Sequence, residues 1–550
     1  MRSTTGKRWL AAYDPGVPTD VEDIHLPLAL LLDESAARHP QRPCTTFGGE
    51  TLSYGQVRGL TDRFAAGLTE MGVGAGDRVA LLLPNCPPFV IAYYGALKAC
   101  AVVVPLNPLC TPTELTRYLA QSGAVAIVTV PALLGSVTTA RDGTRVRFVI
   151  VAGGGRPNDT DGTVAFETLL GTAPAPPADP RSVDPDGLAL LMFSGGTTGV
   201  PKAIMLSHTQ CVASARQAVA WGNVTADDRF LAVLPLYHGF GMSITMNAPI
   251  LAGAEIVLLP RFQPGEVLDA IEQHRPTFVG GVPTMFAALT AQPDLMRRDL
   301  RSVRAVFVGA APLTPATKKD FEAATWSRMI EGYGLTEAVT AVMANPYHGL
   351  HKSGSVGLPF PGVDARIVAL DDGRDLGPGE RGEILLRSPT VMLGYADDPE
   401  ATARTVRDGW LYTGDVGWMD EDGYFFVTDR IKELIITGGF NVFPREVDEV
   451  LERHPAVLLT AAIGVPDPYL GERIRSYVVA RPGARVTAGE LIAHAREHLL
   501  AYKVPSQVVF MTDLPLTPIG KVDRRALQGT GQDQAMQEHT IEDQPSQTER

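Results

Sequence analysis

Cysteine is scarce in this sequence, and its spacing excludes two kinds of protein. Only five cysteines occur among 550 residues, and no two of them form a CxxC pair. An odd number without paired spacing argues against both a disulfide framework and a zinc knuckle. We therefore expect a protein that works in a reducing, intracellular environment. The cysteines are Cys44, Cys86, Cys100, Cys110 and Cys211.

Long apolar runs and excess positive charge are also missing. The run LPLALLL from Leu26 is among the longest, and it falls far short of the roughly 18 residues that span a bilayer. The opening stretch MRSTTGKRWLAAYDPG lacks the apolar segment of a secretory signal. The formal net charge of −13 provides no general basic face for nucleic acid or an anionic membrane. We expect a cytoplasmic protein with no membrane span and no nucleic-acid partner.

What is present is a long globular chain with a regular alternation of strands and helices. Its length exceeds the roughly 250–300 residues of a single core, so we expect two to four domains. Short apolar runs separated by helical patterns indicate a parallel sheet that is covered on both faces. This rhythm occupies about 60–180 and returns over about 185–355, which predicts two doubly wound α/β units. In the first unit we expect strands at 78–85, 101–107 and 125–130, and helices at 89–99 and 111–123.

The pattern changes twice beyond Gly354. Short strands and turns predict a β-rich subdomain from about 355, which completes an N-terminal domain of 1–428. From Asp429 we expect a small α+β domain, 429–528, with helices at 444–455 and 487–500 around a hairpin. The tail 529–550 has almost no apolar residues and is predicted to be disordered. The predicted fold class is α/β, with a large N-terminal part and a small C-terminal domain.

The stretch FSGGTTGVPKA, 193–203, has the composition of a phosphate-binding loop and follows a predicted strand at 187–193. Its glycines let backbone N–H groups converge on an anion, its hydroxyls add donors and Lys202 adds charge. It is not a Walker A loop, because Val200 and Pro201 separate Gly199 from Lys202. A Rossmann fingerprint is absent too. The residues alone leave the bound phosphate unidentified.

This loop closely resembles the phosphate loop of the adenylate-forming superfamily, which comprises acyl-CoA synthetases, peptide-synthetase adenylation domains and luciferases. Further motifs follow in the family's order: PLYH at 235–238, GAAP at 309–312, YGLTE at 333–337, YTGD at 412–415, DRIKELIITGGFNVFPREVD at 429–448 and PLTPIGKVDR at 515–524. The family arrangement is a large N-terminal domain and a small mobile C-terminal domain, with a hinge that matches Asp429. One departure is Ala203, where the family usually has glycine.

The resemblance implies a role for each motif in the large domain. The loop would hold the β- and γ-phosphates of ATP, and Thr198 would also take part in catalysis. GAAP would line the adenine pocket, Tyr333 would stack on adenine, and Gly334 would also bind the nucleotide. Thr336 would contact the α-phosphate, and Glu337 would hold Mg²⁺, an ion that needs few protein carboxylates. The loop residues are Ser194, Gly195, Gly196, Thr197, Thr198, Gly199 and Lys202, and the turn residues are Gly309, Ala310, Ala311 and Pro312.

It also implies roles for the acid site and the C-terminal part. His238 would line the acyl site near the substrate carboxylate, with Gly281, Val282 and Met285 as further wall residues. Asp415 would accept hydrogen bonds from the ribose hydroxyls, with Arg430 as second contact. Lys521 would stabilise the charge that develops during adenylation. Lys432 would act as the hinge, and Gly438 and Gly439 would admit the pantetheine arm of coenzyme A.

The resemblance therefore predicts an ATP- and Mg²⁺-dependent acid–thiol ligase, with a small carboxylic acid as substrate. The absence of GxSxG and HExxH motifs agrees with a reaction that needs no nucleophilic side chain. A medium- or long-chain fatty acid with coenzyme A as acceptor is favoured. An aryl acid of the 4-coumarate kind, or loading onto the phosphopantetheine of an acyl-carrier protein, remains open, as does a monomer or homodimer. A nucleotide-binding homologue without activity is disfavoured, because Lys202, Glu337, Asp415, Arg430 and Lys521 are all present.

Overall fold

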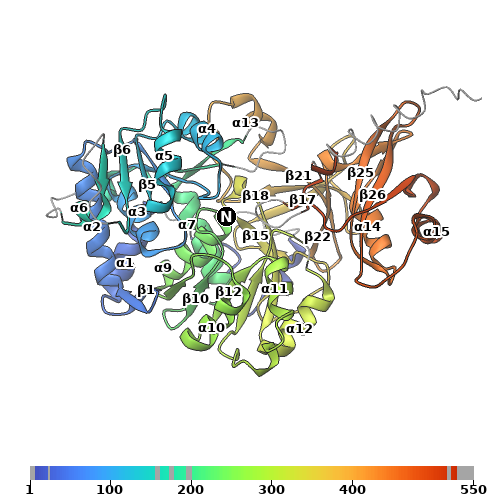
Figure 1. Ribbon diagram of the computed structural model, residues 1–550, viewed down its shortest axis with the longest axis horizontal. Helices are drawn as coiled ribbons and strands as arrows, with labels where there is room; N and C mark the ends of the chain where they lie inside the picture. Colours follow the sequence, from blue (N-terminus) through green and yellow to red (C-terminus); the bar gives the residue numbers. More distant parts are fainter. Residues whose placement is uncertain are drawn as a thin grey trace, which may run out of the picture. The chain divides into compact units, whose positions relative to one another are not determined.

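The computed structural model describes most of the chain (Figure 1), and the chain divides into two compact units. The first unit comprises 1–365, 386–412 and 421–424, and the second comprises 366–385, 413–420 and 425–550. The described residues are 7–22, 25–154, 162–171, 179–193, 201–311, 313–516, 522–524 and 526–528. Among them, no helix is both long and apolar enough to cross a membrane.

The first sheet of unit 1 has eight strands in the order β19-β9-β8-β4-β3-β5-β6-β7. Strands β3 to β7 and β8 run parallel, whereas β9 is antiparallel to β8 and β19 is antiparallel to β9. The bounds are β3 (Arg78–Leu82), β4 (Val102–Pro105), β5 (Ala126–Thr129), β6 (Phe148–Val151), β7 (Thr163–Ala165), β8 (Leu188–Phe193), β9 (Ala203–Ser207) and β19 (Gly394–Tyr395).

Helices cover both faces of this sheet, which explains why its central strands are largely apolar. Val79 and Leu81 of β3 pack with the helices of one face, and Ala80 and Leu82 pack with those of the other. The first face carries α2 (Tyr54–Glu70), α3 (Pro87–Lys98) and α6 (Phe166–Gly171), and the second carries α4 (Pro112–Ser122) and α5 (Leu134–Ala140) (Figure 1).

The second sheet of unit 1 has nine strands in the order β16-β15-β14-β13-β12-β10-β11-β1-β2. The bounds are β1 (Pro43–Phe47), β2 (Glu50–Ser53), β10 (Arg229–Ala232), β11 (Glu255–Leu258), β12 (Phe278–Gly281), β13 (Ala305–Val308), β14 (Arg328–Gly334), β15 (Ala341–Ala344) and β16 (Leu358–Pro359). Its helices include α1 (Leu30–Arg38), α7 (His208–Gly222), α8 (Gly239–Met242), α9 (Ala248–Ala252), α10 (Pro264–His274), α11 (Pro283–Thr290) and α12 (Pro315–Thr325).

The prediction of two covered α/β sheets is confirmed, but the predicted border near residue 185 is wrong. Strands β8 and β9 belong to the first sheet, because β8 pairs with β4 at Val103 and Leu190. Conversely, β1 and β2 join the second sheet, where β1 pairs with β11 at Thr45 and Ile256. An apolar run shows that a strand is buried, but it does not identify the strand's partner.

Two smaller sheets follow. The first runs β17-β18-β21-β20 with β22 beside β21, and the second runs β24-β23-β26-β25 with β27 beside β26. The bounds are β17 (Asp364–Val368), β18 (Gly382–Arg387), β20 (Val406–Arg407), β21 (Trp410–Met419), β22 (Phe425–Arg430), β23 (Ile435–Thr437), β24 (Phe440–Val442), β25 (Val457–Asp467), β26 (Gly471–Ala480) and β27 (Gln507–Phe510). Helix α13 (Pro399–Thr405) precedes β20.

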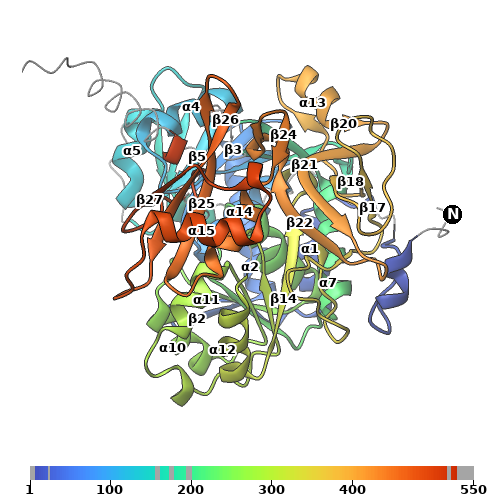
Figure 2. The same ribbon diagram turned by 90° about the vertical axis from the view of Figure 1, so that its right-hand side faces the viewer.

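The last sheet carries two helices on one face, α14 (Pro444–Glu452) and α15 (Ala488–His498) (Figure 2). Val447 and Leu491 of these helices pack on Ile474 and Val478 of β26. The predicted helices and the predicted hairpin are confirmed here, as is the α/β class of the whole chain. The division at Asp429 and the mobility of the C-terminal domain stay predictions, and the tail 529–550 lies outside the described residues.

Candidate active site

The carboxyl ends of three parallel strands meet at one edge of the second sheet. Gly281 at the end of β12 lies beside Val308 of β13, and Val308 lies beside Glu331 of β14. Ligands of open parallel sheets bind beyond such strand ends. The structure therefore brings together, at this edge, the predicted residues Gly281, Val282, Gly309, Ala310, Ala311, Tyr333, Gly334 and Thr336; Pro312 lies outside the described residues.

The backbone at this edge adopts two unusual conformations. Ala310 has a φ of 73° and Val339 a φ of 65°, although neither is glycine. A β-branched residue in this region costs conformational energy, and such strain gathers at functional sites. Gly334 is required for another reason, because a Cβ atom there would collide with the carbonyl oxygen of Thr340. Strained or crowded backbone therefore surrounds the YGLTE segment.

The loop that carries His238 packs against the same segment. A Cβ atom on Gly239 would collide with the carbonyl oxygen of Val339, and the ring of Phe240 lies 3.3 Å from the Cβ position of Gly309. The Nδ1 atom of His238 accepts a hydrogen bond of 3.2 Å from the backbone N–H of Phe240. A neutral His238 ring must then carry its proton on Nε2. Three motifs that are distant in sequence thus meet here.

Asn85 supports this loop, and the sequence reasoning did not find it. Its amide donates to the carbonyl oxygens of Ala232 and Leu234 at 3.0 and 2.9 Å, and its own oxygen accepts from the N–H of Leu236 at 2.8 Å. A buried amide with three bonds fixes the path of the chain between β10 and His238. The only indication in the sequence was that a polar residue, Asn85, ends the predicted buried strand 78–85.

Glu337 has a partner that no sequence motif indicated. The hydroxyl of Tyr395 donates a hydrogen bond of 3.0 Å to Oε1 of Glu337, and the N–H of Met392 donates to the Glu337 carbonyl at 2.8 Å. Burial, followed by the charge of Glu337, raises the pKa of the Tyr395 phenol well above its usual value. The hydroxyl consequently stays protonated and serves as a donor to the carboxylate.

Lys202 lies on the ring of the same tyrosine. Its Nζ atom is 4.3 Å from the centroid of the Tyr395 ring, within the range of a cation–π contact. Strand β19 brings Tyr395 there, since Tyr395 pairs with Ile204 of β9. Phe193 and Ala203 pair across the antiparallel strands β8 and β9, so the predicted phosphate loop lies between these two strands in the sequence. The predicted loop residues Ser194, Gly195, Gly196, Thr197, Thr198 and Gly199 lie outside the described residues.

In unit 2, the two predicted ribose contacts lie side by side. Asp415 of β21 is directly opposite Arg430 of β22, and Nε of Arg430 is 2.8 Å from Oδ1 of Asp415. The Asp415 side chain is only 3% exposed, whereas that of Arg430 is 40% exposed. The guanidinium compensates the buried charge and orients the carboxylate. A carboxylate held in this way can still accept from two vicinal hydroxyls.

Lys521 lies outside the described residues, but the chain on both sides of it is anchored. Leu516 and Val522 form a β-bridge, and the guanidinium of Arg524 binds Asp448 of α14 at 2.6 Å. Arg524 also donates to the carbonyl of Ala462 at 3.2 Å and lies 3.4 Å from Glu433. Burial raises the pKa of the Asp448 carboxyl, and the charge of Arg524 opposes this shift.

The predicted coenzyme A residues occupy a tight hairpin turn. Gly438 and Gly439 connect β23 to β24 with φ values of 56° and 82°. Two successive positive φ values are those of a type I′ turn, which favours glycine irrespective of any ligand. Lys432 lies in the short 3₁₀ helix Ile431–Glu433 and is exposed. Neither observation tests the predicted roles.

This chain is similar to known proteins over most of its length. Residues 32–396 match the family of AMP-binding enzymes, and residues 446–521 match the C-terminal domain of AMP-binding enzymes. The chain is 38% identical over 547 residues to a long-chain-fatty-acid–CoA ligase of Bacillus subtilis, covering 95% of this chain and 97% of the relative. It is 38% identical over 488 residues to a feruloyl-CoA synthase of Amycolatopsis, covering 88% and 95%. The crystal structure of ATP-bound MatB from Rhodopseudomonas palustris aligns with a TM-score of 0.85 at 30% identity, over 92% of this chain and 99% of MatB.

Proposed function

Because this chain belongs to the family of AMP-binding enzymes, we propose that it activates a medium- or long-chain fatty acid as acyl-AMP and transfers the acyl group to coenzyme A. The predicted superfamily and the predicted class, an AMP-forming acyl-CoA synthetase, are confirmed. The observation that carries the choice of reaction is the 38% identity, over 95% of the chain, to a long-chain-fatty-acid–CoA ligase.

The first half-reaction takes place between the acid and ATP. A carboxylate oxygen of the acid attacks the α-phosphorus, the bond to the β-phosphate breaks, and pyrophosphate leaves with the electron pair. Lys202 and the 194–199 loop hold the leaving phosphates, and Lys521 stabilises the charge between carboxylate and α-phosphate. These groups act by position and charge, which is what phosphoryl-type transfer needs.

The residues at Glu337 fit a magnesium ion. The carboxylate is half-buried, and the Tyr395 hydroxyl donates to its Oε1 atom. Among the described residues, no group donates a hydrogen bond to Oε2. Mg²⁺ needs one or two protein carboxylates in addition to phosphate oxygens and water. When bound, the ion neutralises charge on the phosphate oxygens. Tyr395 orients the carboxylate for this role.

The second half-reaction makes the thioester. The thiol of coenzyme A loses its proton, its sulfur attacks the acyl carbonyl, and the bond between that carbon and the AMP oxygen breaks. In our proposal the C-terminal domain turns about Lys432 between the two steps, which withdraws Lys521 and presents Gly438 and Gly439 to the pantetheine arm. Asp415 and Arg430 hold the ribose of AMP through both steps.

A second candidate substrate is an aryl acid. It is supported by the feruloyl-CoA synthase relative, whose identity to this chain is also 38%, although over 88% of the chain. A third alternative is an acyl-carrier protein as acceptor in place of coenzyme A. We place the enzyme in the cytoplasm on the basis of its cysteine pattern, and a monomer and a homodimer both remain open.

An acid-dependent ATP–pyrophosphate exchange screen over fatty and aryl acids tests the proposal. We expect exchange that depends on a fatty acid, and thioester formation when coenzyme A is added. Exchange with aryl acids alone would show that the substrate is an aryl acid, the second candidate. Thioester formation on a phosphopantetheinyl carrier protein, but not on coenzyme A, would show that the acceptor is the carrier protein. No exchange with any acid would contradict the proposed function.

A further inference from the structure

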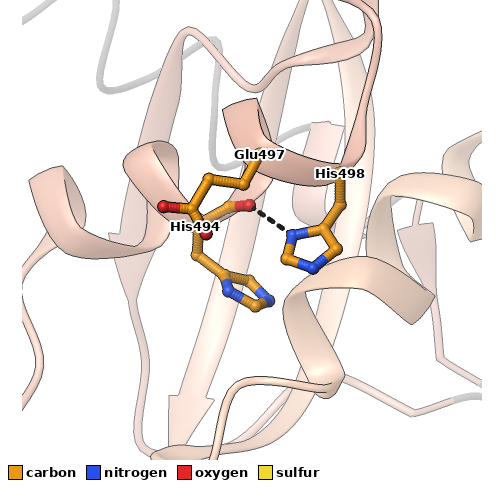
Figure 3. Close-up of side chains that lie close together, drawn as sticks. All are labelled: His494, Glu497 and His498. Carbon is orange, nitrogen blue, oxygen red and sulfur yellow. Dashed lines mark hydrogen bonds between the residues drawn. The ribbon is translucent and has the colours of Figure 1, made fainter.

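Three side chains with metal-ligating atoms lie together near the C-terminal end of α15 (Figure 3). They are His494, Glu497 and His498, and one ligand atom of each lies within 4.8 Å of those of the other two. Their spacing of three and four residues places them on one face of the helix. All three are in unit 2, and none has a role in the ATP, acid or coenzyme A chemistry proposed above.

We propose that this cluster is a binding site for a divalent transition-metal cation such as Ni²⁺, Cu²⁺ or Zn²⁺. Two imidazoles and one carboxylate supply nitrogen and oxygen ligands and leave further positions open to water. Imidazole suits these ions, whereas Mg²⁺ prefers oxygen ligands alone. The site therefore selects a different cation from the one expected at Glu337. The proposal does not depend on the proposed function.

Hydrogen bonds to backbone carbonyls fix the tautomers of both histidines. Nδ1 of His498 lies 2.9 Å from the carbonyl oxygen of His494, and Nε2 of His494 lies 3.1 Å from that of Val450 in α14. A carbonyl oxygen only accepts, so each of these ring nitrogens carries a proton. In the neutral rings the second nitrogen, Nδ1 of His494 and Nε2 of His498, then has a free lone pair. Metal-ligating histidines show the same donation to a backbone carbonyl.

The third ligand is available and the local field favours a cation. Glu497 forms no ion pair with another residue in the described part of the chain. Glu497 and His498 lie in the last turn of α15, where the helix dipole places partial negative charge, and His494 lies one turn earlier. A cation at this position is stabilised by the carboxylate and by the helix terminus together.

The helix that carries the ligands is anchored in the core of unit 2, while the ligands themselves can adjust. Leu491 and Ala495 of α15 are fully buried in the core, and the His494 ring lies 5.3 Å from that of His454 and 4.6 Å from that of His498. Ligands around a tetrahedral ion are about 3.4 Å apart if each bond is about 2.1 Å. The distances between the three ligand atoms, which are now up to 4.8 Å, must therefore shorten when an ion binds. Glu497 and His498 are exposed, so rotation of their side chains can bring the atoms closer.

Titration of the untagged full-length protein with Ni²⁺, followed by calorimetry, tests the site in the absence of ATP and acid. We expect one equivalent to bind with micromolar affinity. His494→Ala and His498→Ala should each weaken binding at least tenfold, and Glu497→Gln should weaken it severalfold. His25→Ala removes an exposed histidine elsewhere and should leave the affinity unchanged. Equal affinity in the wild type and both site variants, or no binding below millimolar Ni²⁺, would overturn the proposal.

Electron paramagnetic resonance of bound Cu²⁺ is a second measurement, because it counts the nitrogen ligands of the ion directly. The wild-type spectrum should show hyperfine coupling to two imidazole nitrogens, and each single histidine variant should retain only one. Far-ultraviolet circular dichroism confirms that the variants fold. A spectrum that is the same in the wild type and in folded His498→Ala protein would show that the ion binds elsewhere.

Discussion

The hydroxyl of Tyr395 donates to the carboxylate of Glu337 at 3.0 Å, and the ring of the same tyrosine carries the ammonium of Lys202 on its face at 4.3 Å. One side chain therefore contacts both the proposed magnesium ligand and the lysine of the phosphate loop. Burial keeps the phenol protonated, so it remains a donor over the physiological pH range. In the proposed function, Tyr395 would therefore couple the positioning of the metal to that of the leaving group.

Tyr395→Phe should raise the Mg²⁺ concentration needed for half-maximal ATP–pyrophosphate exchange by about tenfold, since a net hydrogen bond to a charged group contributes about 1.5–3 kcal/mol. The ring stays in place, so the apparent affinity for ATP at saturating Mg²⁺ should change little. Tyr395→Leu, which removes the ring as well, should weaken ATP binding too. Identical magnesium dependence in the Phe variant would show that the hydroxyl does not orient Glu337.

Glu337→Ala should increase the Mg²⁺ requirement more than Tyr395→Phe does, because the ligand itself is lost. The measurement is exchange rate against free Mg²⁺ at fixed ATP. Combining the two substitutions should add little to the effect of Glu337→Ala alone, since the hydroxyl acts through the carboxylate. An unchanged magnesium dependence in the Ala variant would remove Glu337 from the site.

Lys521→Ala should abolish pyrophosphate release from ATP and acid, while thioester formation from supplied acyl-AMP continues. Arg524→Met should weaken the first half-reaction in the same selective way, because Arg524 anchors the chain beyond Lys521 to Asp448 at 2.6 Å. It also leaves Asp448 buried without its partner, which lowers stability. The paired variant Asp448→Asn with Arg524→Met should restore stability without restoring adenylation. Loss of both half-reactions in stable Lys521→Ala protein would contradict the assignment.

Asp429 should make the stability of unit 2 depend on pH. Burial raises the pKa of its carboxyl to about 7, one oxygen accepts from the N–H of Arg445 at 3.1 Å, and Oδ2 is buried without a hydrogen-bond partner in the described structure. The folded state therefore keeps its proton up to about pH 7, whereas an unfolded carboxyl loses it near pH 4. Between these values the folded state binds more protons, so the free energy of unfolding falls as pH rises.

Asp429→Asn mimics the protonated form at every pH. Its melting temperature should match that of the wild type near pH 5 and exceed it by roughly 5–10 °C at pH 8, because the two pH units between pH 5 and the folded pKa of about 7 correspond to roughly 3 kcal/mol. Burial also raises the pKa of Asp448, which contributes in the same direction, so part of the pH slope should remain. A variant that is less stable than the wild type at pH 8 would refute this interpretation.

The sequence predicted elements wherever burial alone determines their pattern. Strands β3, β4 and β5 are enclosed on both faces, so they read as continuous apolar runs, and the helices between them show an amphipathic period. Strand pairing was harder to predict, because partners such as Val103 and Leu190 are far apart in the chain. The border between the two sheets was therefore misplaced.

The residues of the candidate site also fall into those that the sequence predicted and those that it did not. Motif residues such as Glu337, Asp415 and Arg430 could be named because their spacing within short segments matches a family. Tyr395 lies in a two-residue strand, β19, and reaches Glu337 only because β19 pairs with β9. Asn85 acts through three backbone bonds to a loop about 150 positions away. Contacts of this kind depend on tertiary packing and leave no local pattern.

The route of an oxygen atom from acid to AMP tests the central claim most directly. A long-chain fatty acid labelled with heavy oxygen in its carboxylate would be incubated with the enzyme, ATP, Mg²⁺ and coenzyme A, and the products analysed by mass spectrometry. Attack of the carboxylate on the α-phosphorus predicts AMP that carries a single labelled oxygen and pyrophosphate that carries none. Unlabelled AMP alongside thioester, or label in pyrophosphate or phosphate, would contradict the account.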